Sequence, residues 1–440
     1  MRGKKGHMKQ LLLGAVCFIC LAQALFYGTI KADETTCVIQ TENRIDGNQA
    51  LSLSRDSRDG DLSFTLWGES ENVQVAAPDL NRKANAGLIT AAGSSGLILP
   101  GSRTLEVTDT GGCMIDEKLS GLLFGSTKIQ GKSLMIDGRP YEILGVLPGS
   151  SGTALIQADR DTKAVMNRVT LHITGKESRQ EAVRRFSGST GIQGTLLPLH
   201  LYGIFSEALL RITAAFFLLY LLSGIFRKAD GLFPLLVGIL SAAACIWILD
   251  IRIRIPGDML PSQWSDFAFW AEAAEQKAGE IALLFKAEKS GMELSYFTSA
   301  FISGLFSIFS VLPGYFFLRS LRLRKLSSLL MMTGFFLLLS FSFCILHGQN
   351  SSALIQERIL WLFFPLCLWL TYLKTNIGIQ SPPALEETAI VLNLFFHYTE
   401  ITSLFCAQKE RKPNRKYIKI RDNYNEKKEP ITNGLDRTSQ

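Results

Sequence analysis

The run LHLYGIFSEALLRITAAFFLLYLLSGIF, residues 199–226, separates two kinds of sequence in this chain. It is longer than the roughly 20 apolar residues that an α-helix needs to cross the hydrocarbon core of a bilayer. Its only charged residues, Glu207 and Arg211, are four apart, so they share one helical face within reach of an ion pair. Two interpretations stay open for this intramembrane pair: a structural couple near the interface, or a pathway or gating contact. The run predicts a membrane-spanning helix.

Similar apolar runs lie on both sides of it, and together they predict six spans. They cover residues 11–30, 232–249, 294–318, 326–346 and 359–373, in addition to 199–226. Residues 11–30 fit either a signal peptide or a first span. Ile30 and Lys31 make a poor small-x-small cleavage site, which favours a retained anchor.

Composition agrees with a mixed architecture. The chain has 440 residues, of which 47% are hydrophobic and 19% charged, too apolar for an ordinary soluble protein and too charged to lie wholly in lipid. The net charge of +7 comes largely from basic residues beside the apolar runs and in the tail. Membrane topology explains this excess, and no nucleic-acid partner is expected.

Orientation follows from those basic residues. One side of the predicted bundle receives residues 1–10, Arg227 with Lys228, the basic residues of 319–325, and a tail, residues 375–440. Basic residues in short loops face the cytoplasm, so the chain should be a multi-pass protein of the bacterial cytoplasmic membrane with its N-terminus inside. Residues 33–194 and the loop 250–293 should lie outside.

The outside block, residues 33–194, reads as an α+β domain large enough for its own core. Residues 62–67 and 72–77 are predicted strands, and residues 114–124 a short helix with acidic residues in its first turn. Residues 133–137 and 141–146 are predicted strands of a hairpin joined through residues 138–140. Cys37 and Cys113 lie in this oxidising compartment, where a disulfide and two unlinked thiols are equally compatible with the sequence.

Three segments of this block carry a resemblance: GCMIDEKLSGLLFG at 112–125, IQGK at 129–132 and DGRPYEILGV at 137–146. Together they resemble the MacB-type periplasmic core domain of FtsX-like ABC permeases. The matching residues are Phe124, Gly125, Gly131, Lys132, Gly138, Gly145 and Val146. They form a folding signature, with glycines at turns and Phe124 at the core, and not a catalytic set.

The resemblance implies a permease-like subunit that works with a separate cytoplasmic ATPase. Permeases of that family place one span before the core domain and three after it, whereas this chain has five predicted spans after it. Its loop at residues 227–231 is also too short for a coupling helix. These departures put ATPase docking in question.

Two further segments point to the membrane surface. Trp264, Phe267 and Trp270 recur at helical spacing in the loop 250–293, which suits either an interfacial position or docking against the outer domain. Residues 388–406 predict an amphipathic helix on the inner surface, and the basic tail after them should be disordered near anionic lipids.

The expected fold is therefore an α-helical multi-pass bundle with an N-terminal extracytoplasmic α+β domain. No nucleotide-binding loop, His-Glu-x-x-His motif or Gly-x-Ser-x-Gly elbow occurs, so we expect no enzyme, no catalytic residues, no metal and no cofactor. The expected function is a permease-like subunit of an ABC-type transporter or mechanotransmission complex. The alternative is a non-transporting scaffold or sensor whose outer domain binds a protein. Membrane lipid, an ATPase subunit and homo- or hetero-oligomers are the candidate partners.

Overall fold

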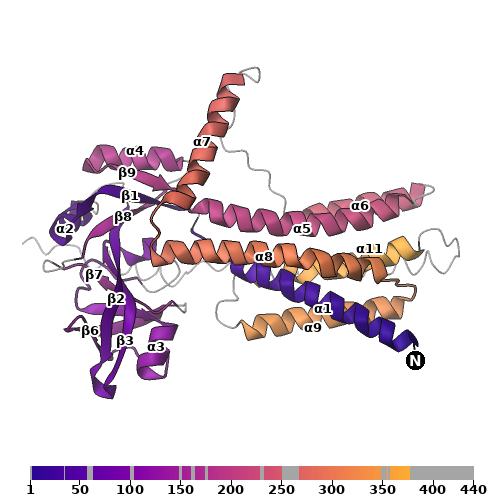
Figure 1. The fold of residues 1–440 in the computed structure, drawn as a ribbon, viewed down its shortest axis with the longest axis horizontal. Helices are drawn as coiled ribbons and strands as arrows, with labels where there is room; N and C mark the ends of the chain where they lie inside the picture. The colour runs from indigo at the N-terminus through magenta and orange to yellow at the C-terminus, as the bar shows by residue number, and fades with distance from the viewer. Residues whose placement is uncertain are drawn as a thin grey trace, which may run out of the picture. The chain divides into compact units, whose positions relative to one another are not determined.

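A computed structural model describes residues 2–33, 35–56, 63–99, 104–147, 151–159, 164–173, 177–227, 232–249, 267–347, 354 and 357–376 (Figure 1). The chain divides into two compact units, Met1–Phe216 with Asp250–Arg319, and Phe217–Leu249 with Ser320–Gln440. The predicted inner-surface helix at 388–406 and the whole basic tail lie outside the described residues, as does Trp264.

The outer domain belongs to the first unit and is built on a nine-stranded sheet of order β3-β7-β4-β6-β5-β2-β8-β1-β9. Because β2 also pairs with β3, six of these strands close into a ring, and β8, β1 and β9 extend from it. The strands are β1 (Thr36–Ile45), β2 (Phe64–Ala77), β3 (Arg82–Ala92), β4 (Gly112–Asp116), β5 (Ser133–Ile136), β6 (Arg139–Leu147), β7 (Thr153–Gln157), β8 (Met166–His172) and β9 (Gly194–Leu197). The domain therefore ends at Leu197, three residues beyond the predicted boundary at Gly194.

The segment that carries the family resemblance folds as strand, helix and hairpin. Between β4 and β5 lies α3 (Glu117–Phe124), whose first turn is capped by the Asp116 carboxylate accepting from the Leu119 amide at 2.8 Å. Gly125 ends α3 in the left-handed conformation, with φ 70°. The hairpin turn is Asp137-Gly138, with φ 48° and 79°, and residues 139 and 140 already belong to β6. The prediction of this hairpin is confirmed, although its turn is tighter than the sequence suggested.

The two strands predicted at residues 62–67 and 72–77 are one long strand, β2. The pairing of β2 with β3 shifts register between Ser70 and Val73, and Asn72 takes a positive φ of 58°. This irregularity produces the polar interruption that looked like a loop. Two helices on the domain were not predicted, α2 (Gly47–Asp56) and α4 (Arg179–Thr190).

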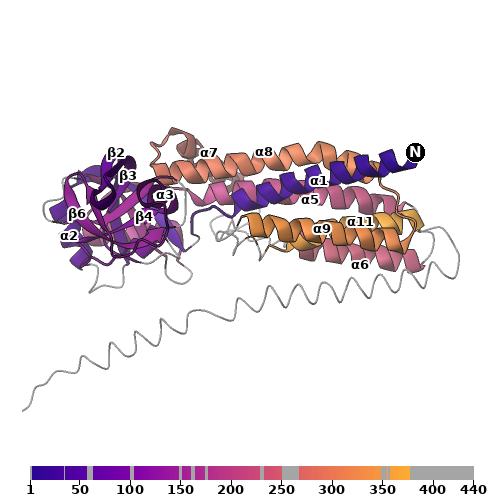
Figure 2. The same ribbon diagram turned by 90° about the horizontal axis from the view of Figure 1, so that it is seen from below.

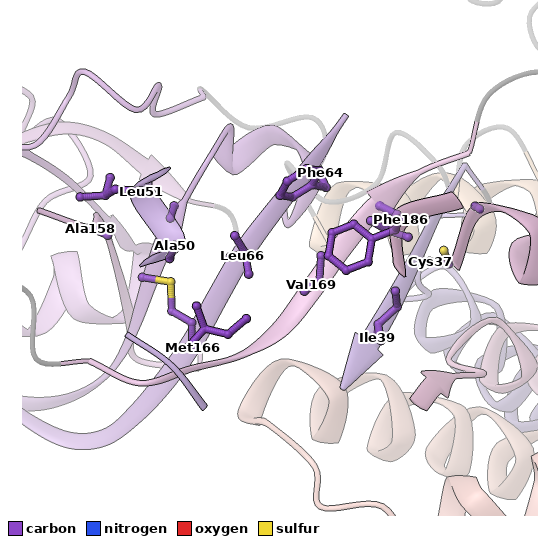
Figure 3. Close-up of a cluster of buried hydrophobic side chains, with 14 residues drawn as sticks. Cys37, Ile39, Ala50, Leu51, Phe64, Leu66, Ala158, Met166, Val169 and Phe186 are labelled. Carbon is purple, nitrogen blue, oxygen red and sulfur yellow. The ribbon is translucent and has the colours of Figure 1, made fainter. Parts of the chain in front are cut away.

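Cys37 and Cys113 are free thiols buried in separate cores, so the disulfide considered between them is absent. Cys37 packs in the cluster of Figure 3, with Phe186 of α4 edge-on to Phe64 at 5.1 Å between ring centroids. Cys113 belongs to a second cluster under α3 that includes Leu119 and Ile143. Burial raises the pKa of Cys37 to about 11 and that of Cys113 to about 12.

The chain connects the domain to α1 and α5 through two adjacent strands. β1 follows α1 (Arg2–Gly28), and β9 precedes α5 (His200–Phe226); β1 and β9 pair antiparallel from Val38–Leu197 to Thr41–Gly194. At the far end of this pair the backbones approach closely, since a Cβ on Gly194 would lie 2.5 Å from the Gln40 carbonyl oxygen. The chain thus enters and leaves the domain at neighbouring points of one sheet edge.

Among the described residues, five helices are long and apolar enough to cross a membrane: Met8–Gly28, His200–Phe226, Gly291–Ser320, Leu326–Leu346 and Arg358–Asn376. They belong to α1, α5, α8 (Gly291–Ser320), α9 (Leu326–Leu346) and α11 (Arg358–Asn376). The sixth predicted span is α6 (Leu232–Leu249), which contains a shorter apolar stretch, Leu235–Leu249. The segment between α6 and α8 holds one more helix, α7 (Phe267–Lys286).

Small residues let the spanning helices pack closely within each unit. In the first unit, the Ser303 hydroxyl of α8 donates to the Ala24 carbonyl of α1 at 2.8 Å. In the second, the Ser340 hydroxyl of α9 donates to the Leu360 carbonyl of α11 at 3.0 Å, and Phe336 stacks on Phe364 at 4.6 Å. Pro313 and Pro365 lie inside α8 and α11.

Candidate coupling site at the start of α8

The N-terminus of α8 is the point where a spanning helix meets the sheet of the outer domain. The sequence Ser290-Gly-Met-Glu293 begins it with a capping box: the Glu293 amide donates to Ser290 Oγ at 3.3 Å, and the Ser290 amide donates to Glu293 Oε2 at 3.0 Å. The capping box fixes the Glu293 side chain beside the first turn. Its other carboxylate oxygen is left for a partner from the domain.

That partner is Arg168 of β8. Its Nε donates to Glu293 Oε1 at 2.9 Å, and its Nη2 donates to Glu293 Oε2 at 3.4 Å and to the Glu288 carbonyl at 2.7 Å. The two side chains are only 3% and 2% exposed. A guanidinium and a carboxylate buried to this degree are stable only as a hydrogen-bonded pair, because either charge alone would be left without water.

A second contact comes from Glu69 of β2. Its Oε2 accepts from the Gly291 amide at 2.7 Å, and its carboxylate also accepts from the Met292 amide. The first amides of a helix have no partner within the helix, so Glu69 supplies acceptors that α8 needs. A Cβ on Gly291 would lie 2.5 Å from Glu69 Oε1, which explains glycine at this position.

Burial raises the pKa of Glu69, against the lowering effect of its hydrogen bonds from Gly291 and Met292. The negative charges of Glu71 and Glu293 raise it further. The ionised form of Glu69 is therefore less favourable here than in water.

Apolar packing completes the joint, by which we mean the contact of β2 and β8 with α5, α7 and α8. Tyr202 of α5, Leu284 of α7 and Ala300 of α8 share one buried cluster with domain residues that include Trp67 and Met114. The Tyr202 hydroxyl donates to the Leu284 carbonyl at 3.1 Å, and its ring lies edge-on to Phe297, with centroids 5.7 Å apart. Trp67 is fixed in turn by its Nε1, which donates to Thr170 Oγ1 at 2.9 Å. Domain and helices therefore share a core.

Glu207 and Arg211, predicted as a pair, form an ion pair on α5. Arg211 Nη2 donates to Glu207 Oε1 at 2.6 Å on α5, and both side chains are partly exposed. This geometry fits a local couple near one end of the helix. Its role in a pathway stays a prediction.

The residues of the family signature lie in and around the α3–β6 segment. Lys132 Nζ lies 5.5 Å over the ring of Phe124, and Lys132 is exposed. Positive φ values are found at Gly125, Gly131 and Gly138, whereas Gly145 is a buried strand residue beside a register shift between β4 and β6. Val146 packs half-buried against the second core. These positions are helix-end, turn and strand residues of the domain.

The predicted aromatic group of the external loop is only partly described. Phe267 is the first residue of α7, and Trp270 is exposed one turn later, with its ring edge-on to Phe269 at 5.7 Å. The part of the chain that the structure describes holds no group of three or more His, Cys, Asp or Glu that could bind a metal ion.

Arg168, Glu293 and Glu69 were not predicted from the sequence, although two signals pointed to them. Ser290-x-x-Glu293 before an apolar run is a capping box. Arg168 directly precedes the apolar and hydroxyl-bearing run Val169-Thr-Leu171 of a buried strand, and an arginine there requires a partner. Neither signal predicts that Arg168 and Glu293 bind each other.

No family model and no curated protein matches the chain. Solved structures are similar to part of it, among them the following two. The periplasmic region of MacB from Actinobacillus actinomycetemcomitans is 15% identical, covering 37% of this chain and 89% of that one, with a TM-score of 0.29. The extracellular domain of the noncanonic ABC-type transporter YknZ from Gram-positive bacteria is 14% identical, covering 37% of this chain and 97% of that one, with a TM-score of 0.28.

Proposed function

We propose that this chain is a permease-like membrane subunit, of an ABC-type transporter or a mechanotransmission complex, in which the outer domain and α8 move as one body. The observation that carries the proposal is the buried Arg168–Glu293 pair, which ties a domain strand to the first turn of a spanning helix. Binding of a substrate or protein partner to the domain would then shift α8. The family signature at residues 112–146 supports the same role.

The path of the chain supports six crossings with the domain outside. α5 leaves the domain after β9, and α8 begins at the domain again, so the chain must return between them. α6 is the apolar helix available for that return. Arg319, Arg322 and Arg324 then fall at the inner end of α8, where basic residues favour the cytoplasm. Exposed Arg322 and Arg324 are the surface that we propose for a cytoplasmic ATPase.

Purification of the tagged full-length chain from its native membrane in mild detergent tests the proposal. We expect an ATPase subunit to accompany it, and charge reversal by Arg322→Glu with Arg324→Glu to release that subunit. In lipid nanodiscs, Arg168→Met should change the rate of ATP hydrolysis by the complex without dissociating it. Arg139→Met, which breaks an exposed pair with Asp159 on the outer domain, is the matched control and should leave the rate unchanged.

One observation favours the alternative, a membrane scaffold or sensor that transports nothing. The connection from α8 to α9 is only residues 321–325, and that from α5 to α6 only residues 227–231, so little chain is left for a coupling helix on the inner side. Under this alternative the chain purifies folded and without an ATPase. Unchanged purification of the Arg322→Glu, Arg324→Glu variant beside it would then refute the permease function.

A further inference from the structure

α7 carries an exposed apolar stripe. Trp270, Ile281 and Phe285 are 39%, 52% and 69% exposed. Ala274 and Ala278 are also exposed, and at 3.6 residues per turn all five fall on one side of the helix. Glu272 and Gln276 lie on the opposite side. α7 is therefore amphipathic, and its apolar side is exposed.

The stripe is distinct from the side of α7 that faces the domain. Leu284 is buried in the joint beneath the hydroxyl of Tyr202, and α7 packs on β9. Partly buried Ala273, Lys277 and Glu280 continue this side, with Lys277 Nζ 3.1 Å from Glu280 Oε1. The domain thus holds α7 by one side and leaves the stripe on another.

The stripe is continuous with the outward surface of α8. Phe285 lies edge-on to Phe297 of α8, with centroids 6.5 Å apart, and Phe297 stacks at 6.5 Å on Phe301. Phe301 and Leu294 are exposed on a helix long and apolar enough to cross a bilayer. Exposed apolar side chains on such a helix face lipid. The same apolar surface therefore passes from α8 onto α7 without interruption.

Two further observations place α7 at the level of the lipid headgroups. Lys289, between the two helices, extends its ammonium 5.6 Å over the ring of Phe297, and Lys286 is exposed at the end of α7. Lysines at the end of a span extend toward the polar interface. Figures 1 and 2 show α7 running across the direction of α5 and α8 and not along it. A helix that leaves a span at this level and in this direction lies along the membrane surface.

We propose that α7 lies in the outer leaflet, with Trp270, Ile281 and Phe285 in contact with lipid at the boundary between headgroups and acyl chains. The helix has the amphipathic form of an interfacial helix, and lipid is favoured over a protein partner because the stripe continues the lipid-facing surface of α8. Since Leu284 belongs to the joint, a displacement of the domain also displaces α7 within the leaflet. The proposal rests on α8 crossing the bilayer and is independent of an ATPase.

Photo-crosslinking of the full-length chain in phosphatidylcholine nanodiscs tests it. p-Benzoylphenylalanine is placed singly at Ile281, Phe285, Glu272 and Phe309, and lipid adducts are measured by mass spectrometry. Phe309, exposed in the middle of α8, is the control for the span. We expect lipid adducts at Ile281 and Phe285 in yields comparable to that at Phe309. We expect no lipid adduct at Glu272, which lies on the polar side of α7.

The remaining outcomes separate the two proposals. A lipid adduct at Phe309 with none at Ile281 or Phe285 overturns the position of α7 and leaves the membrane plan intact. Absence of the adduct at all four positions overturns the span itself, and the proposed function with it. Crosslinks from Phe285 to a second protein or a second copy of the chain in native membranes, in place of lipid, overturn the choice of lipid as the occupant.

Discussion

Replacing Arg168 by methionine should open the joint. The side chains of Arg168 and Glu293 are 3% and 2% exposed, so the loss of the guanidinium leaves a buried carboxylate without its counter-charge. Breaking a buried pair in this way costs about 3–5 kcal/mol. At 1.4 kcal/mol for each factor of ten, opening of the joint should become roughly 100- to 4000-fold more frequent. The Glu288 carbonyl also loses its donor, which acts in the same direction.

Hydrogen exchange of the full-length chain in nanodiscs measures this opening. The exchange is detected by mass spectrometry on peptides that cover β8 and the first turns of α8. Arg139→Met is the control, because its exposed pair with Asp159 contributes only about 0.2–1 kcal/mol, at most roughly a fivefold change. Adding Glu293→Gln to Arg168→Met removes the stranded charge and should restore part of the protection. If Arg168→Met changes exchange no more than Arg139→Met does, the buried pair does not hold the joint.

Three other changes test the domain and the joint. Because the pKa of Glu69 is raised above its ordinary 4.5, its contribution to stability is full below pH 4.5 and is lost as pH rises through the raised pKa. Glu69→Gln should flatten the dependence of the melting temperature on pH. An unchanged dependence would contradict the raised pKa of Glu69. Asp116→Ala removes a helix cap that also accepts from the Gly152 amide and should cost about 2–4 kcal/mol in chemical unfolding, whereas Asp116→Asn should retain much of that stability. Cys37 and Cys113 should resist iodoacetamide in the folded chain and both react in denaturant without reductant; protection that persists in denaturant would reveal a bridge.

The elements that could be predicted are those with local causes. α3 and the β5–β6 hairpin follow from Asp116 at the helix start, Gly125 at its end and Asp137-Gly138 at the turn, all within one short segment. The long apolar helices follow from hydropathy alone, which depends on composition within a window and not on neighbours. The continuity of β2 could not be predicted, because the polar residues at its irregularity look like a loop until β3 is placed beside them.

The joint could not be predicted, because its parts are far apart in the sequence. Arg168 and Glu293 are separated by 125 positions, and their contact depends on the register of β8 beside β2. The sequence indicates only that Glu293 belongs to a helix cap and that Arg168, a charge in a buried strand, needs a hydrogen-bonding partner. Similarly, helical spacing identified the aromatic residues at the start of α7, but the stripe at Ile281 and Phe285 becomes meaningful only when α8 is seen to continue it.

The side-by-side arrangement of β1 and β9 determines how the domain bears mechanical load. α1 and α5 are attached to the same end of this two-stranded ribbon, at Val38 and Leu197. Tension that draws the two helices apart within the bilayer would tear the ribbon open one hydrogen-bonded rung at a time, beginning at its membrane end. Tension along the ribbon must instead overcome all of its rungs together. The β1–β9 connection therefore resists force along the strands better than force that separates α1 from α5. Axial tension is transmitted to the domain, whereas separation of the two helices opens the strand pair.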